Sequence, residues 1–275
     1  MKIAASKIAF VGGGNMARAL IGGMIAKGYD RSALSVIEVL PAAGERLAAE
    51  HKVHVSAAPD ARTYAADVLV LAVKPQDMKT ALKSLAGEVT GKLVISIAAG
   101  VRVDALSRWL RGHRKLVRCM PNTPSLIGAG IAALYALREV SAEEKQKAEG
   151  ILRAVGEVVW VEDERLLDPV TALSASGPAY VFWFIEQLAA SGEKLGLEKQ
   201  TSLKLAMQMV LGSAKLAAQS VDSPGELRRQ VTSKGGTTEA ALKVFEQERL
   251  ADKVMKALEA ASRRGAELGD ELGKD

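Results

Sequence analysis

A glycine-rich segment near the N-terminus has the residue spacing of a site for phosphate groups. Gly12, Gly14 and Ala17 form the pattern G-x-G-x-x-A, which directly follows the apolar run KIAFV and opens the helical stretch MARALIGGMIAKG. In this arrangement backbone N–H groups and the positive end of the helix dipole face a pyrophosphate. Alanine at the third position still lets the helix pack closely on the strand. The segment therefore predicts a dinucleotide site.

An acidic side chain at the end of the second apolar run bears on which dinucleotide binds. Glu38, in SVIEVL, lies 24 residues after Gly14 and is expected to accept hydrogen bonds from an adenosine ribose. A carboxylate there repels a 2′-phosphate, because like charges about 4 Å apart interact by roughly 4 kcal/mol at an effective dielectric constant near 20. The choice between NADH and NADPH stays open, since Glu38 pointing to solvent, a rotated Glu38 or the nearby Arg46 would remove the conflict.

Two further segments end apolar runs and are expected to lie beside the same ligand. LAVKPQ carries Lys74 and Pro75, and SIAAG carries Ala98, Ala99 and Gly100. In a doubly wound sheet, ligands bind beyond the carboxyl ends of the strands. Small residues there let the backbone approach a nicotinamide ring. Lys74 has a simpler alternative, as a surface residue ahead of a helix-starting proline.

The order of apolar runs over residues 7–165 predicts how these segments are positioned. Short β-branched runs alternate with helical stretches, which indicates an α/β fold with a doubly wound parallel sheet of Rossmann type. The expected strands are KIAFVG, SVIEV, VHV, VLVLAV, LVISIAA and KLVRCMP. VLVLAV and LVISIAA are apolar on both faces, as a strand covered by helices on each side requires, so we expect them at the centre of the sheet.

After VVWV (158–161) the sequence changes character. Apolar residues recur at helical spacing without strand signals in three long stretches, 179–195, 199–218 and 250–268. We therefore predict a dinucleotide-binding Rossmann domain at 1–165 and an all-helical domain at 166–275. The stretch YVFWFI within the first helix is apolar around most of its circumference and must be buried on several sides. It is expected at a subunit interface, and filling the core of one chain is the alternative.

Composition excludes several classes of protein. The chain has 275 residues, of which 48% are hydrophobic and 25% charged, enough for one large core or two modest ones. The longest apolar runs fall short of the roughly 18 residues that a membrane span needs, and the glycine turn leaves no room for a signal peptide before it. The net charge is +5, but basic and acidic residues are mixed, so that even Arg108, Arg111, Arg114 and Lys115 are interpreted as a solvated face. We expect a cytoplasmic protein with no membrane or nucleic-acid partner.

The residues that most often carry metal or thiol chemistry are few. Cys119 is the single cysteine and ends an apolar segment, so it is expected to be a buried, small hydrophobic residue rather than a reactive thiol. His51, His54 and His113 have no Cys, Asp or Glu at ligand spacing. No metal site is predicted.

Six motifs together resemble the pyrroline-5-carboxylate reductase family. In order along nearly the whole chain they are GGGNMA, AVKPQ, SIAAG, MPNTP (120–124), SASGPAYVF (174–182) and TSKGGTTEAAL (232–242). MPNTP and GGTT are far more specific to this family than the glycine loop. The resemblance implies reduction of L-1-pyrroline-5-carboxylate to L-proline, the last step of proline biosynthesis, with NADPH or NADH as cofactor. It also implies a homodimer through the helical domain, with assembly to a decamer left open.

The resemblance assigns the loop 233–238 to the carboxylate of the substrate. Its glycines expose N–H groups, a helix follows, and two threonine hydroxyls add donors. Thr238 is the expected catalytic residue, with its hydroxyl near the imine nitrogen. The residues alone fit an ordinary helix cap equally well. The predicted substrate-binding residues are Ser176, Ser233, Gly235, Gly236, Thr237 and Thr238.

The SASGPAY segment adds secondary candidates to this pocket. Ser174 and Tyr180 are expected to line it with Ser176, and capping of the helix near Pro178 is the alternative for the two serines. Ala175 stands where the family usually has glycine, and Lys234 stands where proline is common. Alanine disfavours a positive φ, so activity requires a negative φ at Ala175.

The resemblance completes the cofactor site with an asparagine of MPNTP. The predicted cofactor-binding residues are Gly12, Gly13, Gly14, Asn15, Met16, Ala17, Glu38, Ala72, Val73, Lys74, Pro75, Ala98, Ala99 and Asn122. Two other functions fit part of the sequence. A β-hydroxyacid dehydrogenase shares the plan of a Rossmann domain and helices, but Lys204 and Lys215 lie outside its catalytic lysine motif. A non-catalytic dinucleotide sensor has no need of the MPNTP and SKGGTT segments.

Overall fold

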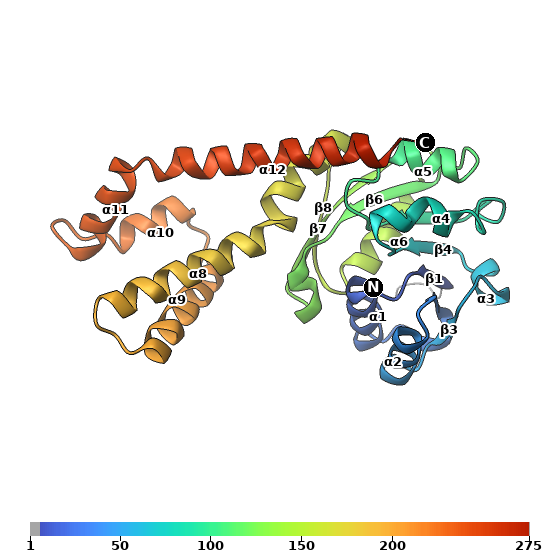
Figure 1. The fold of residues 1–275 in the computed structure, drawn as a ribbon, viewed down its shortest axis with the longest axis horizontal. Coiled ribbons are helices and arrows are strands. Elements are labelled where there is room, and N and C mark those ends of the chain that lie inside the picture. Colours follow the sequence, from blue (N-terminus) through green and yellow to red (C-terminus); the bar gives the residue numbers. More distant parts are fainter. Residues whose placement is uncertain (1–5, 275) are drawn as a thin grey trace. The chain divides into compact units, whose positions relative to one another are not determined.

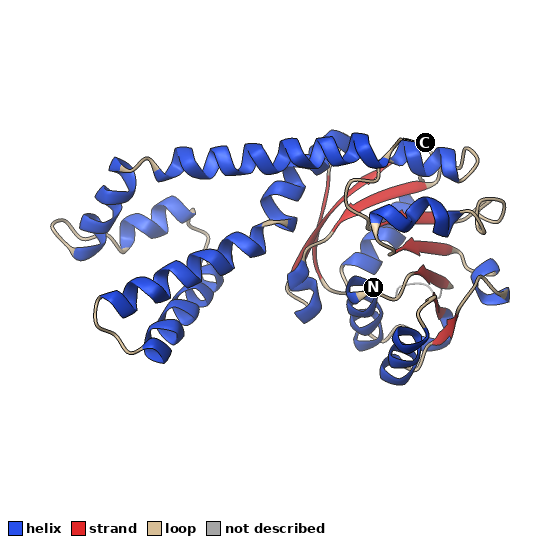
Figure 2. Cartoon of the chain, in the orientation of Figure 1, coloured by secondary structure: helices blue, strands red, loops and turns tan. Residues whose placement is uncertain are grey.

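The computed structural model describes residues 6–274, and within them an eight-stranded sheet runs through the first part of the chain (Figures 1 and 2). The strands lie in the order β3-β2-β1-β4-β5-β6-β7-β8. Their bounds are β1 Ile8–Val11, β2 Leu34–Ile37, β3 His54–Ser56, β4 Val68–Leu71, β5 Leu93–Ser96, β6 Leu116–Met120, β7 Gly130–Ala136 and β8 Gly156–Trp160. Strands β1 to β6 pair in parallel. The predicted doubly wound parallel sheet is confirmed, with β4 and β5 inside it and buried along their whole length.

Strand β7 is an antiparallel strand that the sequence pattern did not predict. It pairs antiparallel with β6 and parallel with β8. Its sequence, GIAALYA, is rich in glycine and alanine, which have little intrinsic preference for strands. Pairing on both sides therefore decides its conformation. An antiparallel strand toward the edge of a mainly parallel sheet is common in this fold class.

The helices alternate with the strands up to β8 and then continue alone. Their bounds are α1 Asn15–Ala26, α2 Pro41–His51, α3 Ala61–Tyr64, α4 Met78–Leu82, α5 Val103–Trp109, α6 Ala142–Leu152, α7 Leu167–Val170, α8 Gly177–Lys194, α9 Lys199–Gln219, α10 Pro224–Gln230, α11 Thr237–Gln247 and α12 Leu250–Leu272. Short 3-10 turns are η1 Arg31–Ala33, η2 Pro75–Asp77, η3 Thr123–Ile127 and η4 Glu164–Leu166, and η5 Thr171–Ala175 is a π-helix. The three long predicted helices are present as α8, α9 and α12.

Two hydrophobic clusters cover the two faces of the sheet, because successive side chains of a strand point to opposite faces. Ile8 and Phe10 of β1 belong to one cluster, and Ala9 and Val11 belong to the other. Helices α1 and α6 contribute to the first cluster, and helices α4 and α5 contribute to the second. Cys119 is fully buried in the first cluster, and burial raises the pKa of its thiol, so the prediction of a buried residue is confirmed.

The chain divides into two compact units. The first contains the residues up to Ser176 together with those from Ala260, and the second is Gly177–Glu259. The predicted domain boundary at 165/166 marks where strands give way to helices, whereas the units divide later. The reason is that Leu167 of α7 is fully buried against Met120 and Ala133 of the sheet. Among the described residues, no helix combines the length and the apolar character that a membrane span requires.

Candidate active site

The glycine loop after β1 is fixed by close backbone contacts. Gly12 has a φ of +98°, and a Cβ added to it would lie 2.8 Å from the carbonyl oxygen of Ala72. Its N–H donates to the carbonyl of Ile37 at 2.8 Å, and the N–H of Ala72 donates to the carbonyl of Val11 at 2.8 Å. The ends of β1, β2 and β4 therefore meet at this loop, and only glycine fits at position 12.

The N-terminus of α1 has the features of an anion cradle. Gly14 is its N-cap residue, with no side chain to cap the first turn and no acidic residue in that turn. A Cβ added at Gly14 would meet no atom within 4 Å, so the space above the helix end is open. Unpaired N–H groups and the helix dipole favour negative charge there. Asn15 is exposed and Met16 half-buried, whereas Ala17 is fully buried. Burial of Ala17 fits the predicted close packing of the helix, and its contact with a cofactor stays a prediction.

Glu38 does not point to solvent. Its Oε2 accepts a hydrogen bond from the N–H of Gly13 at 2.8 Å, and its Oε1 accepts one from the N–H of Leu40 at 2.8 Å. The carboxylate thus lies at the glycine loop, on the side of β2. This finding removes the solvent-facing alternative.

The remaining predicted cofactor residues lie at the same edge of the sheet. In register, Val11 of β1 is opposite Ile37 and Leu71, and Leu71 is opposite Ser96, so four parallel strands end together. Four predicted residues follow β4, where Ala72, Val73 and Pro75 are half-buried and Lys74 is exposed. After β5, Ala98 is buried and Ala99 is exposed. The sheet brings these residues together with the glycine loop, whereas the exposure of Lys74 also fits the alternative of a surface residue.

Asn122, which follows β6, has both ends of its side-chain amide engaged. Its Oδ1 accepts from the N–H of Ile131 at 3.0 Å, and its Nδ2 donates to the carbonyl of Ser174 at 3.2 Å. The residue is 9% exposed. Asn122 therefore ties the MPNTP segment to β7 and to the π-helix η5, and contact with a cofactor remains a prediction.

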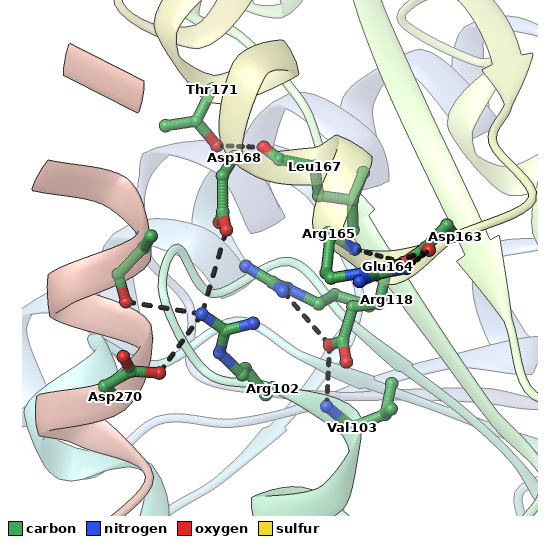
Figure 3. A network of polar contacts seen from close by, with 11 residues as sticks. Arg102, Val103, Arg118, Asp163, Glu164, Arg165, Leu167, Asp168, Thr171 and Asp270 are labelled. Atoms are coloured by element: carbon green, nitrogen blue, oxygen red, sulfur yellow. Dashed lines mark hydrogen bonds and ion pairs between the residues drawn. The ribbon is translucent and has the colours of Figure 1, made fainter. Parts of the chain in front are cut away.

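A network of polar groups lies at the start of α5 (Figure 3). Glu164 Oε1 accepts hydrogen bonds from Arg118 Nη1 at 3.0 Å and from the N–H of Val103 at 2.8 Å. The side chains of Arg118 and Glu164 are 2% and 14% exposed. Sequence reasoning missed this network, although an arginine inside the apolar strand LVRCM requires an acidic partner. Through these two hydrogen bonds, Glu164 holds the N-terminus of α5 against β6.

Arg102, the N-cap residue of α5, extends this network to the C-terminal end of α12. Its Nη2 lies 3.2 Å from Asp270 Oδ1, 3.3 Å from the carbonyl of Ala266 and 3.7 Å from Asp168 Oδ2 (Figure 3). A Cβ added at Gly100, which has a φ of +75°, would lie 2.9 Å from Leu272 Cδ1. The end of α12 therefore rests on the SIAAG loop.

The second unit contains the loop 233–238, which leads into α11. The N-cap residue of α11 is Gly236, and no side chain caps the helix. Gly235 has a φ of +72°, and its N–H donates to Glu239 Oε2 at 2.7 Å. That hydrogen bond is the main cause of the lowered pKa of Glu239. Since neither Thr237 nor Thr238 caps α11, the alternative of an ordinary threonine cap is removed, and the first-turn N–H groups stay free of side chains.

The SASGPAY segment (174–180) contains the end of the π-helix η5 and the start of α8. Ser174 Oγ donates to the carbonyl of Val170 at 3.0 Å, so it does not cap α8, and the N–H of Ser176 donates to the carbonyl of Thr171 at 2.9 Å. The described non-glycine residues with positive φ are Lys52, Arg111 and Arg249. Ala175 is not among them, so alanine is compatible with this backbone.

Other charged groups singled out in the sequence have local partners. Arg114 pairs with Glu139 at 3.2 Å, and Lys115 pairs with Glu144 at 2.7 Å. The basic cluster at 108–115 is thus partly neutralised. Within residues 6–274, no three His, Cys, Asp or Glu side chains gather as a metal site would require.

Two family models match this chain, one in the part that contains the sheet and one in the helical part that follows. Residues 7–100 match the family described as NADP oxidoreductase coenzyme F420-dependent. Residues 164–268 match the family described as pyrroline-5-carboxylate reductase dimerisation.

Named relatives are similar to this chain over almost its whole length. The chain is 44% identical to pyrroline-5-carboxylate reductase of Pseudomonas aeruginosa, over 98% of each chain. A solved pyrroline-5-carboxylate reductase from Coxiella burnetii superimposes with a TM-score of 0.92 at 42% identity, over 96% of this chain and 98% of that one. Plasmodium falciparum pyrroline carboxylate reductase, solved with NADP bound, gives a TM-score of 0.84 at 28% identity, over 96% and 98% of the two chains. The chain belongs to the pyrroline-5-carboxylate reductase family.

Proposed function

We propose that this protein reduces L-1-pyrroline-5-carboxylate to L-proline with NAD(P)H. The observation that carries the proposal is the uncapped N-terminus of α11 after Gly235 and Gly236, in a chain whose family acts on this substrate. A carboxylate is the group that such a helix end binds well. The proposal includes cytoplasmic residence.

The residues around the glycine loop fit the cofactor. The open space above Gly14 suits a pyrophosphate, and the first-turn N–H groups of α1 are free to bind it. Glu38 lies where the adenosine ribose is expected, and the loops after β4 and β5 would flank the nicotinamide half. When bound, NAD(P)H supplies the hydride. The chain's own task is to hold the cofactor with one face of its ring toward the substrate.

The loop 233–238 is proposed to hold the substrate. The N–H groups at the start of α11 would bind the carboxylate, and Ser176 and Ser233 would add hydroxyl donors. The Thr238 hydroxyl would contact the imine nitrogen, which orients the C=N carbon toward the hydride donor. Positioning of this kind supplies a large part of the rate enhancement in two-substrate reactions.

No strong acid is needed if the imine binds in its protonated form. Hydride adds to the ring carbon, the two electrons of the C=N π-bond move to nitrogen, and the cation becomes a neutral secondary amine. The Thr238 hydroxyl then has to hold the nitrogen, while the surrounding groups exclude water. This chemistry agrees with a predicted site that contains no histidine or cysteine.

A homodimer through the helical unit is part of the proposal. On α8, Phe182 and Trp183 are 62% and 59% exposed, which favours an interface over the alternative of filling the core of one chain. Exposed aromatic and aliphatic residues of this size mark interaction surfaces. The dimerisation family matched by residues 164–268 supports the same reading. Assembly of dimers into a decamer is a further step, to be tested by measuring the mass in solution.

The test adds L-1-pyrroline-5-carboxylate to purified protein with NADPH or with NADH. Oxidation of each cofactor is measured by absorbance. Turnover that yields proline supports the proposal, and omission of the imine is the control for background oxidation. Cofactor binding without turnover would instead favour a dinucleotide sensor or an enzyme for another imine.

A further inference from the structure

The carboxylate of Glu38 is held in place at the glycine loop. Each oxygen accepts one backbone hydrogen bond, from Gly13 or from Leu40, at 2.8 Å. A carboxylate oxygen has two lone pairs, so each oxygen can accept one more hydrogen bond. The two remaining positions match the two neighbouring hydroxyls of an unmodified adenosine ribose.

Rotation of Glu38 away from the loop would break both hydrogen bonds. The side chain is also packed against the loop, because a Cβ added at Gly13 would lie only 3.1 Å from Glu38 Oε2. Glycine at position 13 thus makes room for this side chain. A rotated carboxylate that clears the way for a 2′-phosphate is therefore disfavoured.

The residues directly after Glu38 carry no side chain that could bind a phosphate. They are Val39, Leu40, Pro41, Ala42 and Ala43. None of them has a hydroxyl or a cation, Pro41 has no N–H, and the N–H of Leu40 is already bound to Glu38. Val39 and Leu40 are 70% and 64% exposed. Apolar side chains there suit the flat face of an adenine.

We propose that Glu38 makes this protein select NADH over NADPH. The carboxylate accepts hydrogen bonds from the 2′- and 3′-hydroxyls of the adenosine ribose and repels a 2′-phosphate. The inference rests on the proposed function only for the identity of the reaction, since the discrimination concerns binding of the dinucleotide. For a partly solvated pair of like charges, we expect roughly a 10- to 100-fold difference in affinity and in kcat/KM.

The first experiment is titration calorimetry of the full-length protein with NAD⁺ and NADP⁺, together with kcat/KM for NADH and NADPH. Glu38→Gln keeps the size of the side chain and removes its charge. The variant is expected to bind NADP⁺ more tightly and to bring the two affinities within a few-fold of each other. Glu45→Gln, which removes an exposed carboxylate on helix α2, the helix that follows Glu38, is the matched control and should leave the ratio unchanged.

Several outcomes would overturn the inference. In the wild-type protein, binding of NADP⁺ as tight as or tighter than that of NAD⁺ would contradict the inference directly, without any variant. An unchanged ratio in Glu38→Gln would remove Glu38 as its cause, and weaker NADP⁺ binding in Arg46→Ala would assign the 2′-phosphate to Arg46. Preferential NAD⁺ binding without reduction of the imine would leave the role of Glu38 intact and overturn only the proposed reaction.

Discussion

The glycine loops 12–17 and 233–238 both present backbone N–H groups at the start of a helix, but the surroundings of the two loops are opposite. Each leads into a helix whose first turn lacks a side-chain cap. Gly12 and Gly13 are buried, and their contacts reach three strands and a carboxylate, whereas Ser233 and Gly235 are exposed. Packing therefore constrains the first loop, and the expected ligand constrains the second. Substitutions at the packed positions of the first loop should change stability, and those in the second loop should change substrate binding or catalysis alone.

The largest effect is expected from Glu164→Ala in the first unit. Arg118 would be left buried without its carboxylate, and the N–H of Val103 would lose its acceptor. Removing one partner of a buried ion pair costs about 3 to 5 kcal/mol. The measurement is the free energy of unfolding by urea. Glu157→Ala is the control, because this carboxylate is 78% exposed beside Arg153 and its loss should cost less than about 1 kcal/mol. Equal losses in both variants would contradict the role of the network.

Gly12→Ala and Gly14→Ala form a matched pair within the first loop. Alanine at position 12 would require a positive φ and would meet the carbonyl oxygen of Ala72, so we expect a loss of about 2 to 4 kcal/mol of folding free energy. Alanine at position 14 meets no atom within 4 Å and keeps a φ of −66°. It should change stability by less than about 0.5 kcal/mol and yet weaken dinucleotide binding. Similar stability losses at both positions would be inconsistent with an open cradle.

The contrast between residues fixed by packing and residues in an exposed loop also explains which features could be predicted from the sequence. Residues with a packing role, such as Cys119 and the strands β4 and β5, follow from the apolar runs that contain them, and the structure confirms that they are buried. The glycine pattern likewise required a strand before it and a helix after it, both of which are present.

Features that depend on contacts distant in sequence were not predicted. Strand β7 has a weak intrinsic preference and is defined by its neighbours. The partner of Arg118 is Glu164, 46 positions away, and the end of α12 packs on a loop near residue 100. The candidate substrate loop has no packing role that periodicity could reveal. Its assignment came from the resemblance of the SKGGTT segment to a family.

Thr238→Ala tests the second loop. Loss of one positioned hydrogen bond should lower kcat/KM for the imine. The corresponding rise in activation free energy should be about 1 to 3 kcal/mol. The free energy of unfolding should stay within about 0.5 kcal/mol of wild type, because Thr238 does not cap α11. Thr238→Ser keeps the hydroxyl and should restore most of the activity. An unchanged kcat/KM in the alanine variant would remove Thr238 from the mechanism.

The smallest effect is expected from Glu239→Gln, which weakens the hydrogen bond that holds Gly235. The pKa of Glu239 is lowered from 4.5, chiefly by the N–H of Gly235 and by Lys243. A lowered pKa means that its contribution is fully present above the usual pKa and is lost only as the pH falls through the lower value. The wild-type KM for the imine should therefore be independent of this group between about pH 6 and 8. In the variant, KM should rise roughly two- to threefold at constant stability. If unfolding became easier while KM stayed constant, the loop would be stabilised by packing, and the contrast with the first loop would be lost.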